Sequence, residues 1–154
     1  MDPLSLTLSI TALIGTTSQV VTYLNDVKDA PKERAKLASE AACLYHLLIQ
    51  LKYRVDEAKA GDKWYESTRT LLGGSDGPLD QFGNALTELA GKLLPAAGLK
   101  EFGRKLTWTL NKKECKGILD KIEQLKTLAG LALQEDALQV FWIKCVCALS
   151  TDCK

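Results

Sequence analysis

The first helix-forming segment of the chain has an apolar stripe and carries no charge. Between Pro3 and Asn25 there is no Asp, Glu, Lys or Arg, and Ser and Thr fill much of the polar side. Asp2 can cap such a helix, and Pro3 suits its first position. The pattern predicts a helix over 3–27 that is either part of a core or a segment that inserts elsewhere. Its apolar residues recur at helical spacing: Leu6, Ile10, Leu13, Ile14, Val20, Val21, Leu24 and Val27.

Three further long helices are indicated by apolar positions that alternate in steps of three and four, as in bundle helices. They are expected over about 31–60, 78–94 and 113–136. The apolar positions are Leu37, Ala41, Leu44, Leu48, Leu51 and Val55 in the first, Leu79, Phe82, Leu86, Leu89 and Leu93 in the second, and Ile118, Ile122, Leu125, Ala129 and Ala132 in the third.

Short helices are expected over 63–72 and 99–110, and residues 73–78 form the clearest loop because Gly and Pro dominate them. No convincing strand pattern occurs before residue 137. The sequence therefore predicts an all-α fold, a helical bundle of four long helices plus one or two short ones.

The last segment differs from the rest. Residues 137–149 are almost continuously apolar, and Lys144 is their only charge. This stretch is too short to span a bilayer alone. Either it packs as the end of the last helix, or it is not native domain sequence and marks the abrupt end of a longer gene product. We therefore divide the chain into a helical domain, 1–136, and an apolar Cys-rich tail, 137–154.

Composition limits the class of protein. The 154 residues suit one domain, and a formal net charge of +1 argues against general nucleic-acid binding. The N-terminus lacks the basic region of a secretory signal, and the first helix is too polar in its second half for a good membrane span. Five cysteines, an odd number without regular spacing, favour a reducing cytoplasmic compartment with free thiols.

Candidate chemistry is sparse. His46 is the one histidine and lies mid-helix, Cys145 and Cys147 form a lone C-x-C, and Gly73-Gly74-Ser75 lacks the lysine of a phosphate loop. A lone helical histidine is more often a tolerated polar group than a base or ligand. We expect no catalytic, cofactor or metal site and no small-molecule substrate.

A basic segment occupies residues 98–116, with six cations against Glu101 and Glu114. It either attracts anionic lipid headgroups or is a solvated surface with local salt bridges. The six cations are Lys100, Arg104, Lys105, Lys112, Lys113 and Lys116.

Several motifs carry a family resemblance. The opening Met1-Asp2-Pro3-Leu4-Ser5, the uncharged first helix and the segment from Tyr23 to Arg34 occur together and in order. With them the chain resembles the N-terminal domain of fungal STAND proteins, the fungal NOD-like receptors, which is called HeLo-like and is also described at the start of an azaphilone-pigment-cluster protein. Supporting matches, within residues 1 to about 136, are Leu51-Lys52-Tyr53-Arg54, Gly77-Pro78-Leu79-Asp80-Gln81-Phe82, Lys105-Leu106-Thr107-Trp108 and Lys112-Lys113-Glu114.

The resemblance implies a non-enzymatic signalling or effector domain, normally part of a larger receptor, in a cell-death or defence response. Related domains are proposed to act on membranes through the first helix. The expected partners are further copies of the chain or related helical domains, together with an anionic membrane on activation. Under this hypothesis Leu6, Ile10, Leu13, Ile14, Val20 and Val21 insert or pack.

Alternatives remain open. The chain departs from the family pattern after Asp136, which leaves a stand-alone domain or a gene model that extends past its last proper exon. A second hypothesis is a helical interaction adaptor or truncated receptor fragment without membrane activity. A third, kept by the pigment-cluster occurrence, is an enzyme or an accessory of a biosynthetic pathway.

Overall fold

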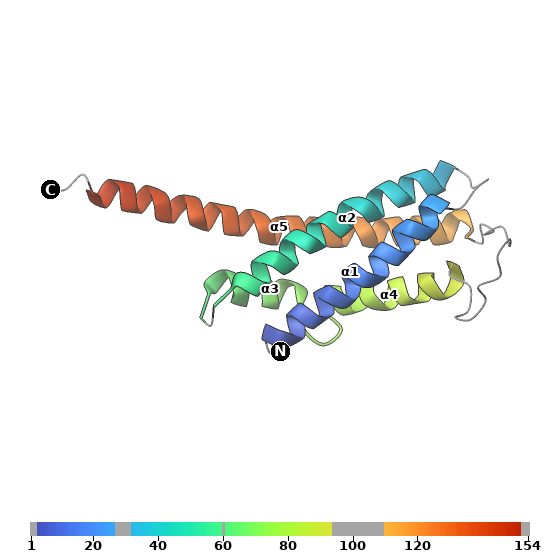
Figure 1. Ribbon diagram of the computed structural model, residues 1–154, viewed down its shortest axis with the longest axis horizontal. Coiled ribbons are helices and arrows are strands. Elements are labelled where there is room, and N and C mark those ends of the chain that lie inside the picture. The colour runs from blue at the N-terminus through green and yellow to red at the C-terminus, as the bar shows by residue number, and fades with distance from the viewer. Residues whose placement is uncertain (1–2, 27–31, 60, 94–109, 152–154) are drawn as a thin grey trace.

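The described part of the chain is helical throughout. The computed structural model describes residues 3–26, 32–59, 61–93 and 110–151, and these residues contain no strand (Figure 1). The expected all-α fold is confirmed, and the expected helix over 99–110 lies almost wholly outside the described residues. The helices are α1 Pro3–Asp26, α2 Lys32–Glu57, α3 Lys63–Leu72, α4 Pro78–Leu93 and α5 Lys112–Thr151.

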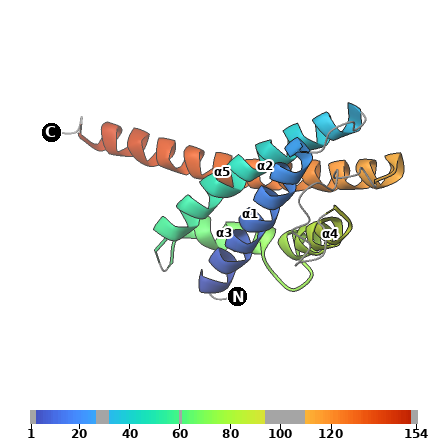
Figure 2. The same cartoon turned by 45° about the vertical axis from the view of Figure 1, so that its right-hand side comes forward.

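Four helices form the bundle. α1 packs on α2 and α4, and α5 packs on the other sides of the same two helices. Along the chain α1, α2, α4 and α5 alternate in direction (Figure 1). The short α3 packs mainly on α5, near the end of α2 (Figure 2).

Most positions of the predicted stripes whose side chains are described are buried in the core. Each bundle helix turns its three-four alternation inward, because that spacing keeps apolar side chains on one side of a helix. Trp64 of α3 is the largest fully buried side chain. The other completely buried large residues are Leu6, Ile10, Val20, Leu24, Leu37, Leu44, Leu48, Leu51, Leu72, Ile122 and Leu125.

The last helix is longer than expected. α5 continues to Thr151, so an end near Asp136 is wrong. No Gly or Pro occurs between 137 and 151 to stop it, and Ala and Leu are good helix formers. The added turns project beyond the bundle (Figure 1). Among the described side chains of these turns, Leu138, Phe141 and Val146 are 55%, 63% and 56% exposed, so these three do not pack as the end of a bundle helix should.

A polar network fixes α5 where it leaves the bundle. The Arg54 guanidinium lies 4.4 Å from the centre of the Trp64 ring and forms ion pairs with Asp136 at 2.9 Å and Asp62 at 3.2 Å. The Trp64 indole Nε1–H donates to the carbonyl oxygen of Ala132 at 2.6 Å. The end of α2 and the beginning of α3 are therefore tied to the same turn of α5. We call these residues the exit network.

Candidate functional site

The apolar stripe of α1 faces the bundle core. These residues pack toward α2 and α4, the two helices on which α1 mainly packs. The candidate residues for membrane insertion are thus part of the bundle core in this structure. Leu6, Ile10, Leu13 and Val20 are buried, and Ile14 and Val21 are half-buried.

The outward face of α1 is uncharged, and much of its hydrogen-bonding capacity is satisfied by the helix itself. Three threonine hydroxyls donate to the carbonyl four residues earlier, which removes part of their need for water. Leu8 adds an apolar side chain that is 61% exposed. The hydroxyl pairs are Thr11 to Thr7 at 2.7 Å, Thr16 to Ala12 at 3.1 Å and Thr22 to Ser18 at 3.0 Å.

Polar contacts join α1 to α2 near each end of α1. Near the start, the Thr7 hydroxyl donates to Asp56 Oδ1 at 3.4 Å. At the other end, Arg34 Nη1 donates to the carbonyl oxygen of Leu24 at 2.7 Å. The second bond satisfies one of the carbonyls that a helix leaves open at its C-terminus.

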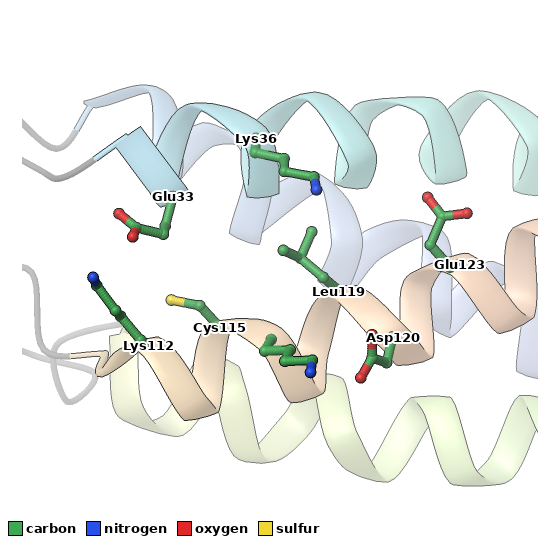
Figure 3. Close-up of a pocket in the computed structure, with 8 residues that line it drawn as sticks. Glu33, Lys36, Lys112, Cys115, Leu119, Asp120 and Glu123 are labelled. Atoms are coloured by element: carbon green, nitrogen blue, oxygen red, sulfur yellow. The ribbon is translucent and has the colours of Figure 1, made fainter.

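A groove lies between the beginnings of α2 and α5 (Figure 3). Its volume is about 440 Å³, and Glu33 and Lys112 extend toward each other across it. The Cys115 side chain is buried, and that burial, followed by the nearby charges of Glu33 and Glu114, raises the pKa of the Cys115 thiol. The thiol is therefore a poor nucleophile at neutral pH. The lining residues are Glu33, Lys36, Lys112, Cys115, Lys116, Leu119, Asp120 and Glu123.

The basic segment is only partly described. Lys112 and Lys116 line the groove, where three acidic and three basic side chains balance one another. Lys113 is exposed and is not among the groove residues. Within the described residues this arrangement favours a solvated, charge-balanced surface over a continuous cationic patch. Lys100, Arg104 and Lys105 lie outside the described residues.

The start of α5 is capped and tied to α4. The Asn111 side chain accepts from the backbone N–H of Glu114 at 2.9 Å, and the Glu114 carboxylate accepts from the backbone N–H of Asn111 at 3.0 Å. This reciprocal pair is a capping box. Lys92 of α4 also pairs with Glu114 at 3.1 Å. The Asn111 and Lys92 bonds together lower the pKa of Glu114.

A second ion pair joins α2 to the middle of α5. Lys126 donates to the Glu40 carboxylate, and it also pairs with Glu123 one turn away at 3.1 Å. The hydrogen bond from Lys126 is the main reason why the pKa of Glu40 is lowered. Each bundle helix other than α1 is thus linked to α5 by charge as well as by packing.

The residues considered for chemistry are scattered. His46 is exposed and makes an edge contact with the Tyr45 ring at 5.7 Å. Residues 73–77 form a turn, in which Gly74 takes a φ of +107° that favours glycine. Among the described residues, no three His, Cys, Asp or Glu side chains gather in a way that could hold a metal ion.

Within the described helices, none combines the length and apolar character needed to cross a bilayer.

Comparison with known proteins gives no relative. No family model, curated protein or solved structure matches the chain.

Two features of the structure were missed from the sequence. The exit network joins residues from three helices, and no spacing along one helix signals it. The sequence does contain a pattern that indicates the projecting end of α5. Its exposed apolar residues keep the three-four alternation that is typical of a helix-pairing surface.

Proposed function

We propose that the chain is a non-enzymatic signalling domain of the fungal NOD-like receptor type, which self-associates and acts on membranes in a cell-death or defence response. The observation that carries the proposal is α1 itself. Its inner stripe is apolar, and its outer face has no charge from Pro3 to Asn25. An ordinary surface helix of a bundle places charged side chains on the outer face.

The packing of α1 allows it to leave while the other helices stay together. α1 packs on α2 and α4, whereas α5 packs on α2, α3 and α4. Release of α1 would therefore leave the contacts around α5 in place. Exposing its apolar stripe to water costs about 25 cal/mol per Å², so lipid or a second protein surface must cover the stripe after release.

The membrane step has a defined form. Because none of the described helices is suited to cross a bilayer, α1 would lie in the lipid–water interface with its apolar stripe toward the acyl chains. In this orientation the outer face lies among the headgroups, and the internally bonded hydroxyls of Thr11, Thr16 and Thr22 reduce its need for water there. Lys113, which is exposed and outside the charge-balanced groove, would add about 1 kcal/mol near anionic headgroups.

Dye release from anionic vesicles tests this function. The best variants place a charge on the exposed face of α1, Leu8→Glu or Ala12→Glu, because both positions are exposed and the fold tolerates them. In this orientation both positions lie among the anionic headgroups, where one negative charge costs about 1 kcal/mol, so release should fall about fivefold. Gln50→Glu, on the exposed side of α2, is the matched control and should release dye like the unmodified chain.

Substitution of Ile10 or Leu13 by Asp is a poorer test. Both side chains are buried, so an acidic residue there disrupts the bundle whatever its function. Equal dye release by the unmodified chain, Leu8→Glu and Gln50→Glu would contradict the role of α1, and no release by the unmodified chain would contradict the membrane step itself.

A second candidate is a helical interaction adaptor without membrane activity. The burial of Leu6, Ile10, Leu13 and Val20 favours it, because these residues already have a complete structural role. This function predicts a folded helical protein that binds a related helical domain and releases no dye. The vesicle experiment therefore separates the two candidates.

A further inference from the structure

A second apolar stripe runs along the outer side of α5. Its positions alternate in steps of three and four, and we call them the outer seam. Leu131, Leu138 and Phe141 are 51%, 55% and 63% exposed. In a helix of 3.6 residues per turn the seam lies opposite the buried positions Ile122, Leu125, Ala129 and Ala132. The outer seam consists of Leu131, Gln134, Leu138, Phe141, Cys145 and Ala148.

The stripe changes character along the helix. Its earlier positions, beside the bundle, are Asp120, Gln124 and Thr127, all polar and exposed. From Leu131 onward five of the six seam positions are apolar or cysteine. The apolar part therefore begins where α5 leaves the bundle, and it faces away from α2, α3 and α4.

We propose that the outer seam pairs with the outer seam of a second copy of this chain, with the two helices antiparallel. The pairing supplies a surface for the self-association in the proposed function, and it rests on that proposal for its biological role.

The seam is complementary to itself. In an antiparallel helix pair, first and fourth heptad positions of one helix meet fourth and first positions of the other. If the two-fold axis of the pair passes between Leu138 and Phe141, each Leu138 contacts the Phe141 ring of the second copy. Leu131 then meets Ala148, and Gln134 meets Cys145. Large side chains face smaller ones, every contact occurs twice, and the pair closes with two-fold symmetry.

Charge and bulk favour the antiparallel direction. In a parallel pair the same stripe would bring Asp120 next to Asp120 of the second copy and set the two bundles side by side. In the antiparallel pair the bundles lie at opposite ends of the shared seam. The exit network supports this geometry, because the Arg54–Asp136 ion pair and the Trp64–Ala132 hydrogen bond fix the direction in which α5 leaves the bundle.

The length of the seam sets the strength of the pairing. From Leu131 to Ala148 the helix is about 27 Å long at 1.5 Å per residue. Such a surface is smaller than the roughly 800 Å² per partner of a standard interface. We therefore expect a reversible dimer whose fraction rises with protein concentration.

Sedimentation of the full chain under reducing conditions tests the pairing. Leu138→Glu and Phe141→Glu should sediment as monomers at concentrations where the unmodified chain is dimeric. Both positions are exposed in the single chain, so the helical circular-dichroism signal should be retained. Val146→Glu is the matched control, since Val146 is 56% exposed but lies off the seam, and it should remain dimeric.

Several outcomes would overturn the proposal. One is a monomeric unmodified chain, another is a dimer that survives both seam substitutions, and a third is a dimer that Val146→Glu also abolishes. A chain that is monomeric in solution but floats with phosphatidylserine vesicles, and loses flotation on Phe141→Glu, would mean that lipid covers the seam instead.

Cross-linking tests the direction of the helices. Gln134→Cys places a thiol opposite Cys145 of the second copy, so mild oxidation should give a covalent dimer. The added substitution Cys145→Ser should abolish that cross-link. A cross-link between the two Cys145 side chains of the unmodified chain would establish a parallel pair and contradict the antiparallel one.

The two proposals fail in different ways. Leu8→Glu should leave the dimer intact, because Leu8 lies on α1 and outside the seam. Loss of dye release by Leu8→Glu, with its dimer intact, would support the membrane function independently of the seam. A dimer that persists in Leu138→Glu and Phe141→Glu would refute the seam pairing, whatever the result of the vesicle experiment.

Discussion

Trp64 joins packing, hydrogen bonding and charge at a single residue. Its ring is fully buried, its Nε1–H donates to Ala132, and the Arg54 guanidinium lies over one ring face. The aromatic body supplies burial, and the polar tip satisfies the one donor that burial would otherwise leave unpaired. A smaller side chain would leave a cavity beside α5.

Truncation of Trp64 should therefore be costly. Trp64→Ala should lower the free energy of unfolding by about 3–5 kcal/mol, and Trp64→Phe by less because most of the ring volume remains. Urea denaturation measures both. Tyr53→Ala serves as the surface control, because Tyr53 is 68% exposed, and should change stability by no more than about 0.5 kcal/mol. Similar losses for Tyr53→Ala and Trp64→Ala would contradict this account of the core.

The Glu40–Lys126 ion pair should make the free energy of unfolding depend on pH in the acidic range. The hydrogen bond from Lys126 lowers the pKa of Glu40 in the folded chain, so the folded state holds the proton less tightly than the unfolded state. The stabilisation is present above the unfolded pKa and is lost as pH falls through the folded pKa. Glu40→Gln should therefore lose less stability than the unmodified chain in that acid range. Identical acid dependence of the two chains in thermal melts would show that this pair contributes nothing.

The individual helices follow closely from the sequence, whereas their ends and mutual contacts follow less well. The stripes of α2 and α4 were predictable because three-four spacing places apolar side chains on one side of any helix. The continuation of α5 past Asp136 was one of two interpretations of the apolar tail, because the change in composition suggested a stop that no Gly or Pro supported. The exit network brings Arg54, Trp64 and Asp136 together through the fold, so no local pattern could show it.

The beginning of α3 provides a test of the cap within that network. Asp62 Oδ1 accepts from the backbone N–H groups of Trp64 at 2.9 Å and Tyr65 at 3.3 Å, while Oδ2 pairs with Arg54. Asp62→Ala removes both interactions and should cost about 0.5–2 kcal/mol for the cap alone. Asp62→Asn keeps an oxygen for the cap and should cost less. Equal stability of the two variants in urea would show that the cap does not stabilise α3.

At the scale of the whole molecule, the all-α bundle was predictable and the functional surfaces only partly so. The stripe of α1 was recognised, but the sequence left open whether it packs or inserts, and the structure places it in the core. Lys112 and Lys116 line a groove that contains three basic and three acidic side chains. This balance of charge depends on α2 lying beside α5. The outer seam was visible as an apolar tail, yet its exposure depends on where the bundle ends.

The most direct test of the account asks whether α1 must leave the bundle. Thr7 and Asp56 make a side-chain contact between α1 and α2, so Thr7→Cys with Asp56→Cys gives a disulfide lock that a reductant opens. Dye release from anionic vesicles is then compared before and after reduction, with Thr7→Cys alone as the control. The account predicts no release by the oxidised lock and full release once it is reduced. Equal release in both states would contradict the claim that α1 acts after leaving the bundle.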